Sequence, residues 1–409
     1  MSNLCDEDLA RGPGVNVPKA IAPSAIRVVR LTGLDDLAPY AEDWDRLARD
    51  VPFRSWSWMS CWWRHYGQPP ARGSHLAELY VLAVLDEAGR LIGIAPWYLD
   101  AGSWRGRVLR FLGVGEVCSE YLTVLAVQER EGTVAAALAD WLTAARGPDA
   151  WDLLELTALG GEETAIALLA QRLEAGGNRV HRRAGPSCWR IELPKSWDEY
   201  LATLSKQHRN RLRKAERRLL ASGRAVVHRV PKPEDLPRGE QVLIDLHQAR
   251  WRALGQPGCF SSERYTAFHS DALAELLARG QLILFWIELD DKPFVVEYLM
   301  AAGDTVYHYQ CGLDAGRLAD SPGRLGTIVA LRSAIEGGYR VFDLLRGDES
   351  YKAHFRAKPN PCLEIRAVPA LFLARLRYGI WLASSSAKHR LAAWLAGDRP
   401  HEVETVAEE

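Results

Sequence analysis

Residues 282–299, with the sequence LILFWIELDDKPFVVEYL, give the clearest prediction of the fold. Two apolar and aromatic runs flank the short polar turn Asp290-Asp-Lys292. Such runs on either side of a polar turn are typical of a β-hairpin. The same signal occurs earlier, where Leu79–Leu85 and Leu91–Ala95 surround the turn Asp86-Glu-Ala-Gly89. The chain therefore contains two predicted hairpins about half a chain apart.

Outward from each hairpin, the sequence predicts the same order of elements: strand, two helices, hairpin, strand, helix and strand. Both copies end in a buried strand that carries Asp-Leu-Leu, at Asp152 and Asp343. The first copy is longer, and its excess falls in residues 100–115. The alternative to a duplicated unit is two unrelated α+β domains. The predicted elements of the first copy are 26–31, 39–49, 57–66, 79–85, 91–95, 121–127, 132–145 and 151–156; those of the second are 225–230, 234–254, 263–279, 282–287, 294–299, 305–310, a helix from the turn 321–326 to Gly337, and 341–345.

Composition narrows the class of protein. The chain has 409 residues with a net charge of -1, which excludes a globally basic nucleic-acid binder. Its seven cysteines are dispersed without a CxxC pair, so we expect reduced thiols, no metal and a cytoplasmic protein. The longest apolar run, Leu282 to Ile287, is too short for an integral membrane segment. Residues 1–23 and 397–409 are predicted to be a mobile tail and a polar acidic tail, and 371–396 to be C-terminal helices.

Several short motifs resemble one family of acyltransferases. They are Pro52-Phe-Arg-Ser-Trp56, Ile92-Gly-Ile-Ala-Pro96, Phe111-Leu-Gly113 and Phe342-Asp-Leu-Leu-Arg-Gly347 with Tyr351-Lys352. In this order they resemble the CelD/BcsL family of GNAT-like proteins, which is linked to cellulose and exopolysaccharide biosynthesis. That family is similar to the FemABX peptidyltransferases, which carry two fused GNAT-like domains. The resemblance covers about residues 25–365.

The resemblance implies an α+β fold with two tandem GNAT-like domains and mixed β-sheets, at 24–187 and 188–370. It also implies acyl transfer from acetyl-CoA or another acyl-CoA. The turn Ser321-Pro-Gly-Arg-Leu-Gly326 lies before a predicted helix in the second copy. Glycines and a helix N-terminus suit a pyrophosphate, so Ser321, Gly323, Arg324, Leu325 and Gly326 are the predicted cofactor-binding residues. The alternative is an ordinary helix start with Pro322 in its first turn.

Candidate catalytic residues lie on the same half of the chain. Glu297 interrupts an apolar strand and ranks first as a general base; the alternative is one wet face of that strand. His247, four residues before Trp251 on one helix face, ranks second, although a lone helical histidine is more often structural. Asp343 either takes part in the chemistry or forms a salt bridge that orders the following turn. The catalytic set is completed by Tyr351, and the substrate-binding set includes Trp251, Tyr309, Arg346 and Lys352.

A basic helix is predicted at 205–220. Residues 206–218 hold seven Lys or Arg against one Glu, and Arg209 and Arg213 repeat at helical spacing after Lys206. These three residues are predicted to bind an anionic substrate, such as CoA phosphates, a nucleotide-linked precursor or tRNA; the alternative is a solvated helix face. FemABX-like proteins use charged tRNA as donor, so this helix separates two hypotheses.

Three functions follow from these observations. The first is an acyl-CoA-dependent acyltransferase acting on a hydroxyl or amine of a sugar or polysaccharide precursor in cell-surface polysaccharide synthesis. The second is a FemABX-like aminoacyl-tRNA-dependent peptidyltransferase. The third is a non-catalytic GNAT-fold scaffold or regulatory protein. Peripheral association with a synthesis complex is left open.

Overall fold

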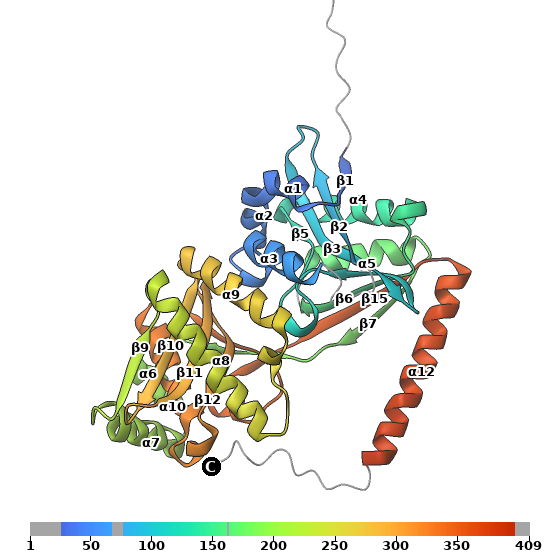
Figure 1. Ribbon diagram of the computed structural model, residues 1–409. Helices are drawn as coiled ribbons and strands as arrows, with labels where there is room; N and C mark the ends of the chain where they lie inside the picture. The colour runs from blue at the N-terminus through green and yellow to red at the C-terminus, as the bar shows by residue number, and fades with distance from the viewer. Residues whose placement is uncertain (1–25, 68–76, 162, 397–409) are drawn as a thin grey trace, which may run out of the picture.

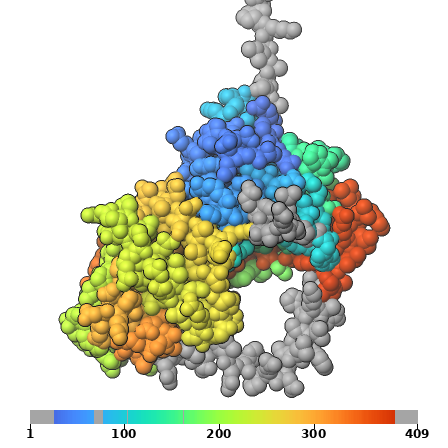
Figure 2. All heavy atoms as spheres, in the orientation of Figure 1, coloured from blue at the N-terminus to red at the C-terminus, as the bar shows by residue number. Residues whose placement is uncertain are grey.

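The computed structural model describes residues 26–67, 77–161 and 163–396 (Figure 1). The predicted terminal segments, 1–23 and 397–409, lie outside these ranges. Two mixed β-sheets form the centres of two halves, which pack against each other over a broad face (Figure 2). This arrangement confirms the prediction of two α+β units.

The first sheet has the strand order β1-β2-β3-β4-β6-β15-β7, with the short β5 paired to β3. Adjacent strands of this sheet pair antiparallel, except that β4 and β6 pair parallel. Its strands are β1 (Arg27–Leu31), β2 (Ala77–Leu85), β3 (Leu91–Ser103), β4 (Gly106–Phe111), β5 (Leu125–Ala126), β6 (Leu153–Gly160), β7 (Arg179–Ala184) and β15 (Cys362–Val368). The helices of this half are α1 (Leu34–Leu37), α2 (Ala41–Ala48), α3 (Trp56–Tyr66), α4 (Glu131–Ala144) and α5 (Thr164–Ala175).

The second sheet repeats this layout in the order β14-β8-β13-β12-β11-β10-β9, and its parallel pair is β12 with β13. Its strands are β8 (Cys188–Glu192), β9 (Ala225–Arg229), β10 (Leu282–Leu289), β11 (Pro293–Ala302), β12 (Thr305–Leu313), β13 (Val341–Arg346) and β14 (Lys358–Asn360). The helices are α6 (Trp197–Thr203), α7 (Lys206–Ala215) with a π-helical turn over Glu216–Leu220, α8 (Leu236–Ala253), α9 (Glu263–Ala278), α10 (Pro322–Glu336) and α11 (Tyr351–His354).

The helices of the second half divide between the two faces of its sheet. Apolar residues of α8 and α9 share one core with the first half, whereas those of α6, α7 and α10 form a separate core on the opposite face. Helix α9 lies beside α3 of the first half. The first core therefore joins the two halves, and the second core supports the face that carries α7 and α10.

The two halves also exchange strands. β8 directly follows β7 along the chain but pairs with β13 in the second sheet, whereas β15 directly follows β14 but lies in the first sheet between β6 and β7. The range 188–370 predicted for the second domain therefore includes one strand of the first sheet. The chain therefore crosses from one half to the other twice, once between β7 and β8 and once between β14 and β15.

Most predicted elements are present, and both hairpins are confirmed as β2–β3 and β10–β11. The predicted strand at 121–127 is wrong as a continuous element: Leu125–Ala126 forms a two-residue strand on β3, and Leu122 makes an isolated bridge to Leu159. Tyr121 has a φ of 58°, in the left-handed region, which breaks an extended strand. Its place in the sheet is taken by β4, which lies in the Arg- and Gly-containing stretch 100–115.

A single helix, α12 (Phe372–Ala396), follows the last strand; it begins beside the first half and extends away from it (Figure 1). Ala374 and Tyr378 pack on Val108, Leu153 and Val368 of the first sheet. Among the described residues, no helix has both the length and the apolar character needed to cross a bilayer.

Candidate functional site

The parallel strands β12 and β13 separate toward their C-terminal ends. They pair only from Thr305–Tyr307 with Val341–Asp343, although β12 continues to Leu313. The register of β12 against β11 shifts between Tyr298 and Leu299, so that Tyr309 is the extra residue of a β-bulge. Bulges bend a strand and re-aim its side chains. The opened end of the sheet lies where ligands of α/β sheets commonly bind.

Glu297 of β11 is the central carboxylate at this end. Its side chain is buried, and Oε2 lies 2.6 Å from His308 Nε2 on β12. Cys311 is directly opposite Glu297 across the two strands. The donor atoms of Glu297, His308 and Cys311 lie within 4.8 Å of one another. His308 is therefore the partner of Glu297, the carboxylate ranked first as a general base from the sequence.

Helix α10 packs directly on this carboxylate because Gly326 has no side chain. A Cβ on Gly326 would lie 2.1 Å from Glu297 Oε1, whereas one on Gly323 would meet only Leu313 Cδ2, at 3.9 Å. The two glycines of the predicted turn thus differ: Gly326 permits close packing of helix on sheet, and Gly323 borders open space. Leu325 is fully buried in the second core.

A pocket of about 390 Å³ lies outside the first turn of α10. Cationic side chains from two elements converge on it, namely Arg211, Lys214 and Arg218 of the basic helix and Arg324 of α10; the other lining residues are Ala215, Leu219, Ala319, Asp320 and Ser321. Since the first N–H groups of a helix have no intrahelical acceptor, that of Arg324 can serve an anion. Of the predicted cofactor-binding residues, Ser321 and Arg324 therefore share one pocket with the basic helix, whereas Gly323, Leu325 and Gly326 do not line it.

The electrostatics of this pocket favour an anion. Arg218 pairs with Asp320 at 3.2 Å, but Arg211, Lys214 and Arg324 have no carboxylate partner in the described part of the chain. Burial lowers the pKa of Arg324, and the neighbouring Arg211 lowers it further. Burial also lowers the pKa of His208, with His354 and Arg324 adding to the effect. A bound phosphate would relieve this repulsion between like charges.

The basic-helix residues named from the sequence lie elsewhere on α7. Lys206 is exposed, Arg209 donates to the Leu201 carbonyl at 3.4 Å, and Arg213 pairs with Asp198 at 3.6 Å. None of these three lines the pocket. The sequence locates the helix but not which of its faces turns toward α10.

Asp343 is a buried link between the halves. It accepts hydrogen bonds from the Tyr121 hydroxyl at 2.6 Å, from Arg190 Nε at 2.7 Å and from the Leu345 N–H at 2.8 Å. Burial raises the pKa of Asp343, while Arg190 and Tyr121 oppose that shift. Its hydrogen-bonding capacity is largely taken up by these structural partners.

The side chain of Lys352 stabilises the turn that follows β13. Lys352 is buried, and its Nζ donates to the carbonyls of Leu345, Arg346 and Gly347 at 3.2, 3.0 and 3.0 Å. Arg346 forms an ion pair with the buried Glu120 of the first half. These contacts place Lys352 and Arg346 in the architecture of the turn.

Tyr351 begins α11 and packs against the second core. Burial raises the pKa of its hydroxyl, and Cys311, Glu349 and Glu297 add to the shift. Of the residues predicted to be catalytic, Glu297 and Tyr351 thus lie near each other. Asp343 is on the neighbouring strand but turns toward the first half.

His247 and Tyr309 are both committed to packing between elements. His247 Nε2 accepts from Trp251 Nε1 at 3.0 Å, and its Nδ1 lies 3.2 Å from Gln248 Oε1. Burial lowers the pKa of His247, which favours its neutral form. The Tyr309 hydroxyl donates to the Val117 carbonyl of the first half at 2.5 Å. Trp251 is partly exposed beside His247.

Comparison with known proteins gives the fold. Residues 206–353 match the sequence model of a family described as Acetyltransferase (GNAT) domain. No curated protein sequence matches the chain. Among solved structures, FemX is similar with a TM-score of 0.59 at 12% identity, covering 86% of this chain and 99% of that one.

Two further structures share the fold. The C-terminal domain (DUF2156) of a protein described as a lysylphosphatidylglycerol synthetase, from Agrobacterium fabrum, has a TM-score of 0.50 at 14% identity and covers 83% of this chain and 95% of that one. A conserved protein of unknown function from Bacteroides thetaiotaomicron has a TM-score of 0.52 at 10% identity, with 84% and 99% covered. The chain therefore has a fold of two tandem GNAT-like units, and residues 206–353 of its second half match the GNAT family model. Membership of the CelD/BcsL family itself stays a prediction.

Proposed function

We propose that the second half transfers an acyl group from acyl-CoA to a hydroxyl or amine. One juxtaposition carries this proposal: the first turn of α10 has Arg211, Lys214 and Arg324 around a pocket on its outer side and the Glu297–His308 pair against its inner side. The pocket suits the phosphates of CoA. The thioester would then lie at the opened ends of β12 and β13.

The proton acceptor in this proposal is His308, oriented by Glu297. With Glu297 Oε2 accepting from His308 Nε2, the imidazole carries its proton on Nε2 and presents the lone pair of Nδ1. That nitrogen takes the proton of the attacking hydroxyl or amine as the new C–O or C–N bond forms. The C–S bond then breaks, and the His308 imidazolium gives this proton to the CoA thiolate as it leaves. The buried carboxylate stabilises the imidazolium formed in between.

The acceptor is proposed from the sequence resemblance. It is a hydroxyl or amine of a sugar or polysaccharide precursor, as in cell-surface polysaccharide synthesis. The geometry of the pocket supports acyl-CoA as the donor and carries no information on the acceptor. The test therefore begins with acyl-CoA and then screens sugar acceptors.

The experiment measures release of CoA thiol from acetyl-CoA in the presence of amino sugars and sugar alcohols. Glu297→Gln keeps a hydrogen-bond acceptor for His308 but removes the charge. We expect it to lower turnover by about 100-fold or more, in the range typical of general base catalysis, while CoA affinity stays within about twofold. Unchanged turnover in Glu297→Gln would refute the role of this carboxylate.

A second candidate donor is aminoacyl-tRNA, and one observation favours it. Lys206 and Arg209 lie on α7 outside the pocket and carry its cationic character beyond the residues that line the pocket. If tRNA binds at low micromolar concentration and acyl-CoA does not, the transferase is of the peptidyltransferase type. In that case the Lys206→Ala/Arg209→Ala variant loses tRNA affinity and reduces its salt dependence.

A further inference from the structure

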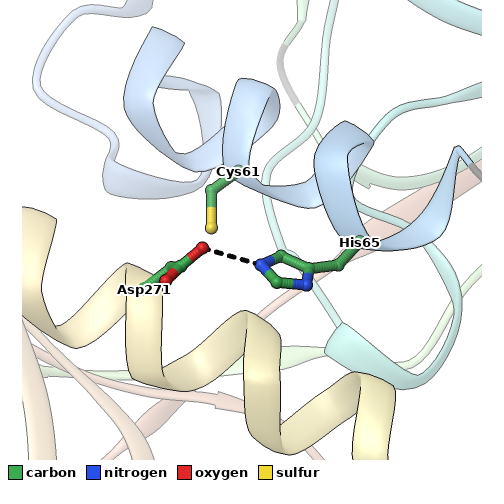
Figure 3. Close-up of side chains that lie close together, drawn as sticks. All are labelled: Cys61, His65 and Asp271. Carbon is green, nitrogen blue, oxygen red and sulfur yellow. Dashed lines mark hydrogen bonds and ion pairs between the residues drawn. The ribbon is translucent and has the colours of Figure 1, made fainter.

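Cys61, His65 and Asp271 form a cluster remote from the pocket, at the contact between the two halves (Figure 3). Cys61 and His65 lie on α3, and Asp271 faces them from α9. Their donor atoms lie within 4.8 Å of one another, and His65 Nε2 is 2.8 Å from Asp271 Oδ2. The Cys61 thiol points toward the same carboxylate (Figure 3).

The supports of this cluster are rigid. Residues four apart share one helix face, so Cys61 and His65 project side by side from α3. The His65 ring packs edge-on against Phe268 of α9, which fixes its orientation, and Asp271 follows Phe268 by three residues on that helix. Each donor therefore stands on a regular helix rather than on a loop.

The donor set is chemically specific. A thiolate sulfur, an imidazole nitrogen and a carboxylate oxygen are the three ligand types of zinc, with bonds of about 2.0–2.3 Å. Ligand atoms of a tetrahedral ion at those distances are about 3.3–3.7 Å apart, so small rotamer changes bring these atoms from their present spacing onto one ion. The Cys61 thiol makes a weak hydrogen bond of 3.7 Å to the Phe268 carbonyl, and it also interacts with the Arg64 side chain.

Access to the cluster fits a cation. Among the charged groups that act on the Cys61 thiol, Arg64 has the largest effect, and Asp271 and Glu275 of α9 oppose it. The thiol is buried, whereas His65 and Asp271 reach the surface with side-chain exposures of 21% and 51%. An ion can therefore enter from solvent and find its sulfur ligand at the inner end of the site.

We propose that Cys61, His65 and Asp271 bind one zinc ion that clamps α3 to α9. Binding replaces the thiol proton by a Zn–S bond, and that proton goes to solvent. His65 binds through Nε2 and keeps its proton on Nδ1, while the fourth position is open to water. The site is independent of the proposed acyl transfer, and its role is to join the two halves.

The test is a titration of the metal-stripped full chain with Co²⁺ and then Zn²⁺. Thiolate ligation of Co²⁺ gives intense near-ultraviolet charge-transfer absorption, which saturates at one equivalent and is abolished by excess Zn²⁺. We expect Cys61→Ser to remove this absorption, and His65→Gln and Asp271→Asn to weaken binding at least tenfold. Because Asp271 is exposed, its substitution leaves the core intact, so an effect there is not a folding defect.

Cys311→Ser is the matched control, since Cys311 belongs to the other cluster, with Glu297 and His308. This variant should bind Co²⁺ like the unsubstituted chain. If Cys311→Ser removes the absorption while Cys61→Ser does not, the metal site is at the sheet end and the proposal is wrong. It is equally wrong if no equimolar binding occurs. A second readout is thermal unfolding, where Zn²⁺ should raise the Tm of the unsubstituted chain and not that of Asp271→Asn.

Discussion

Gly326→Ala should destabilise the protein even though alanine favours helices. The added methyl would lie 2.1 Å from Glu297 Oε1 and 2.9 Å from Val295 Cγ2. Glu297 is 1% exposed and its other oxygen is held by His308, so the carboxylate has little room to move. Overpacking of this kind costs about 1–3 kcal/mol. Replacement of glycine by alanine within a helix returns up to about 1 kcal/mol.

Gly323→Ala is the matched control on the same helix. Its methyl would meet only Leu313 Cδ2 at 3.9 Å, so the helix preference acts almost alone and the variant should be neutral or slightly stabilised. The free energy of unfolding of Gly326→Ala should therefore lie about 1–3 kcal/mol below that of Gly323→Ala. Urea unfolding followed by tryptophan fluorescence measures the difference. Equal stabilities would refute the packing of α10 on Glu297.

Two further predictions concern buried ionisable side chains. Lys352→Ala should lower the free energy of unfolding by about 2–4 kcal/mol, because three carbonyls lose a charged donor. Chemical denaturation measures this loss. A change in KM with unaltered stability would instead place Lys352 in the substrate site. The pKa of His269 is lowered to about 3 by burial, whereas the unfolded chain protonates it near pH 6.5, so unfolding takes up a proton between these values. Stability should therefore fall by about 1.4 kcal/mol per pH unit as the pH decreases through this window, and His269→Gln should flatten that slope while the exposed His181→Gln should not.

The two hairpins and their helices could be predicted because their signals are local. Alternating or continuous apolar runs around short turns determine β2–β3 and β10–β11 without reference to the rest of the chain. The exchange of β8 and β15 between the halves could not be predicted in this way. It depends on strand pairing between segments far apart in sequence, such as β8 with β13 and β15 with β6.

The parts of the candidate site were predictable, but their assembly was not. The turn 321–326 and the basic helix each have a sequence signature, yet only the packed structure shows that Arg211 and Lys214 face Arg324. Glu297 stands out within an apolar strand. Its pairing with His308 depends on cross-strand register, which a bulge at Tyr309 alters.

For other residues, the sequence did not show whether the side chain serves packing or a site. Cys61 and His65 belong to an aromatic helix whose spacing indicates a core face, and their third partner comes from α9, more than 200 residues away in sequence. β13 and the polar segment after it contain the family motif residues Asp343 and Lys352. In the structure both side chains form intramolecular hydrogen bonds. A sequence motif alone does not separate these two uses of a charged residue.

The central claim is that the pocket between α7 and α10 binds the phosphates of an acyl-CoA. Calorimetric titration of CoA and acetyl-CoA into three proteins tests it most directly: the unsubstituted chain, Arg211→Ala/Lys214→Ala, and Lys206→Ala/Arg209→Ala. We predict that the pocket variant weakens binding at least tenfold, as expected for lost charge-assisted contacts, and that the variant of the other face changes it less than twofold. Equal binding by all three proteins, or no binding by the unsubstituted chain, would contradict the account.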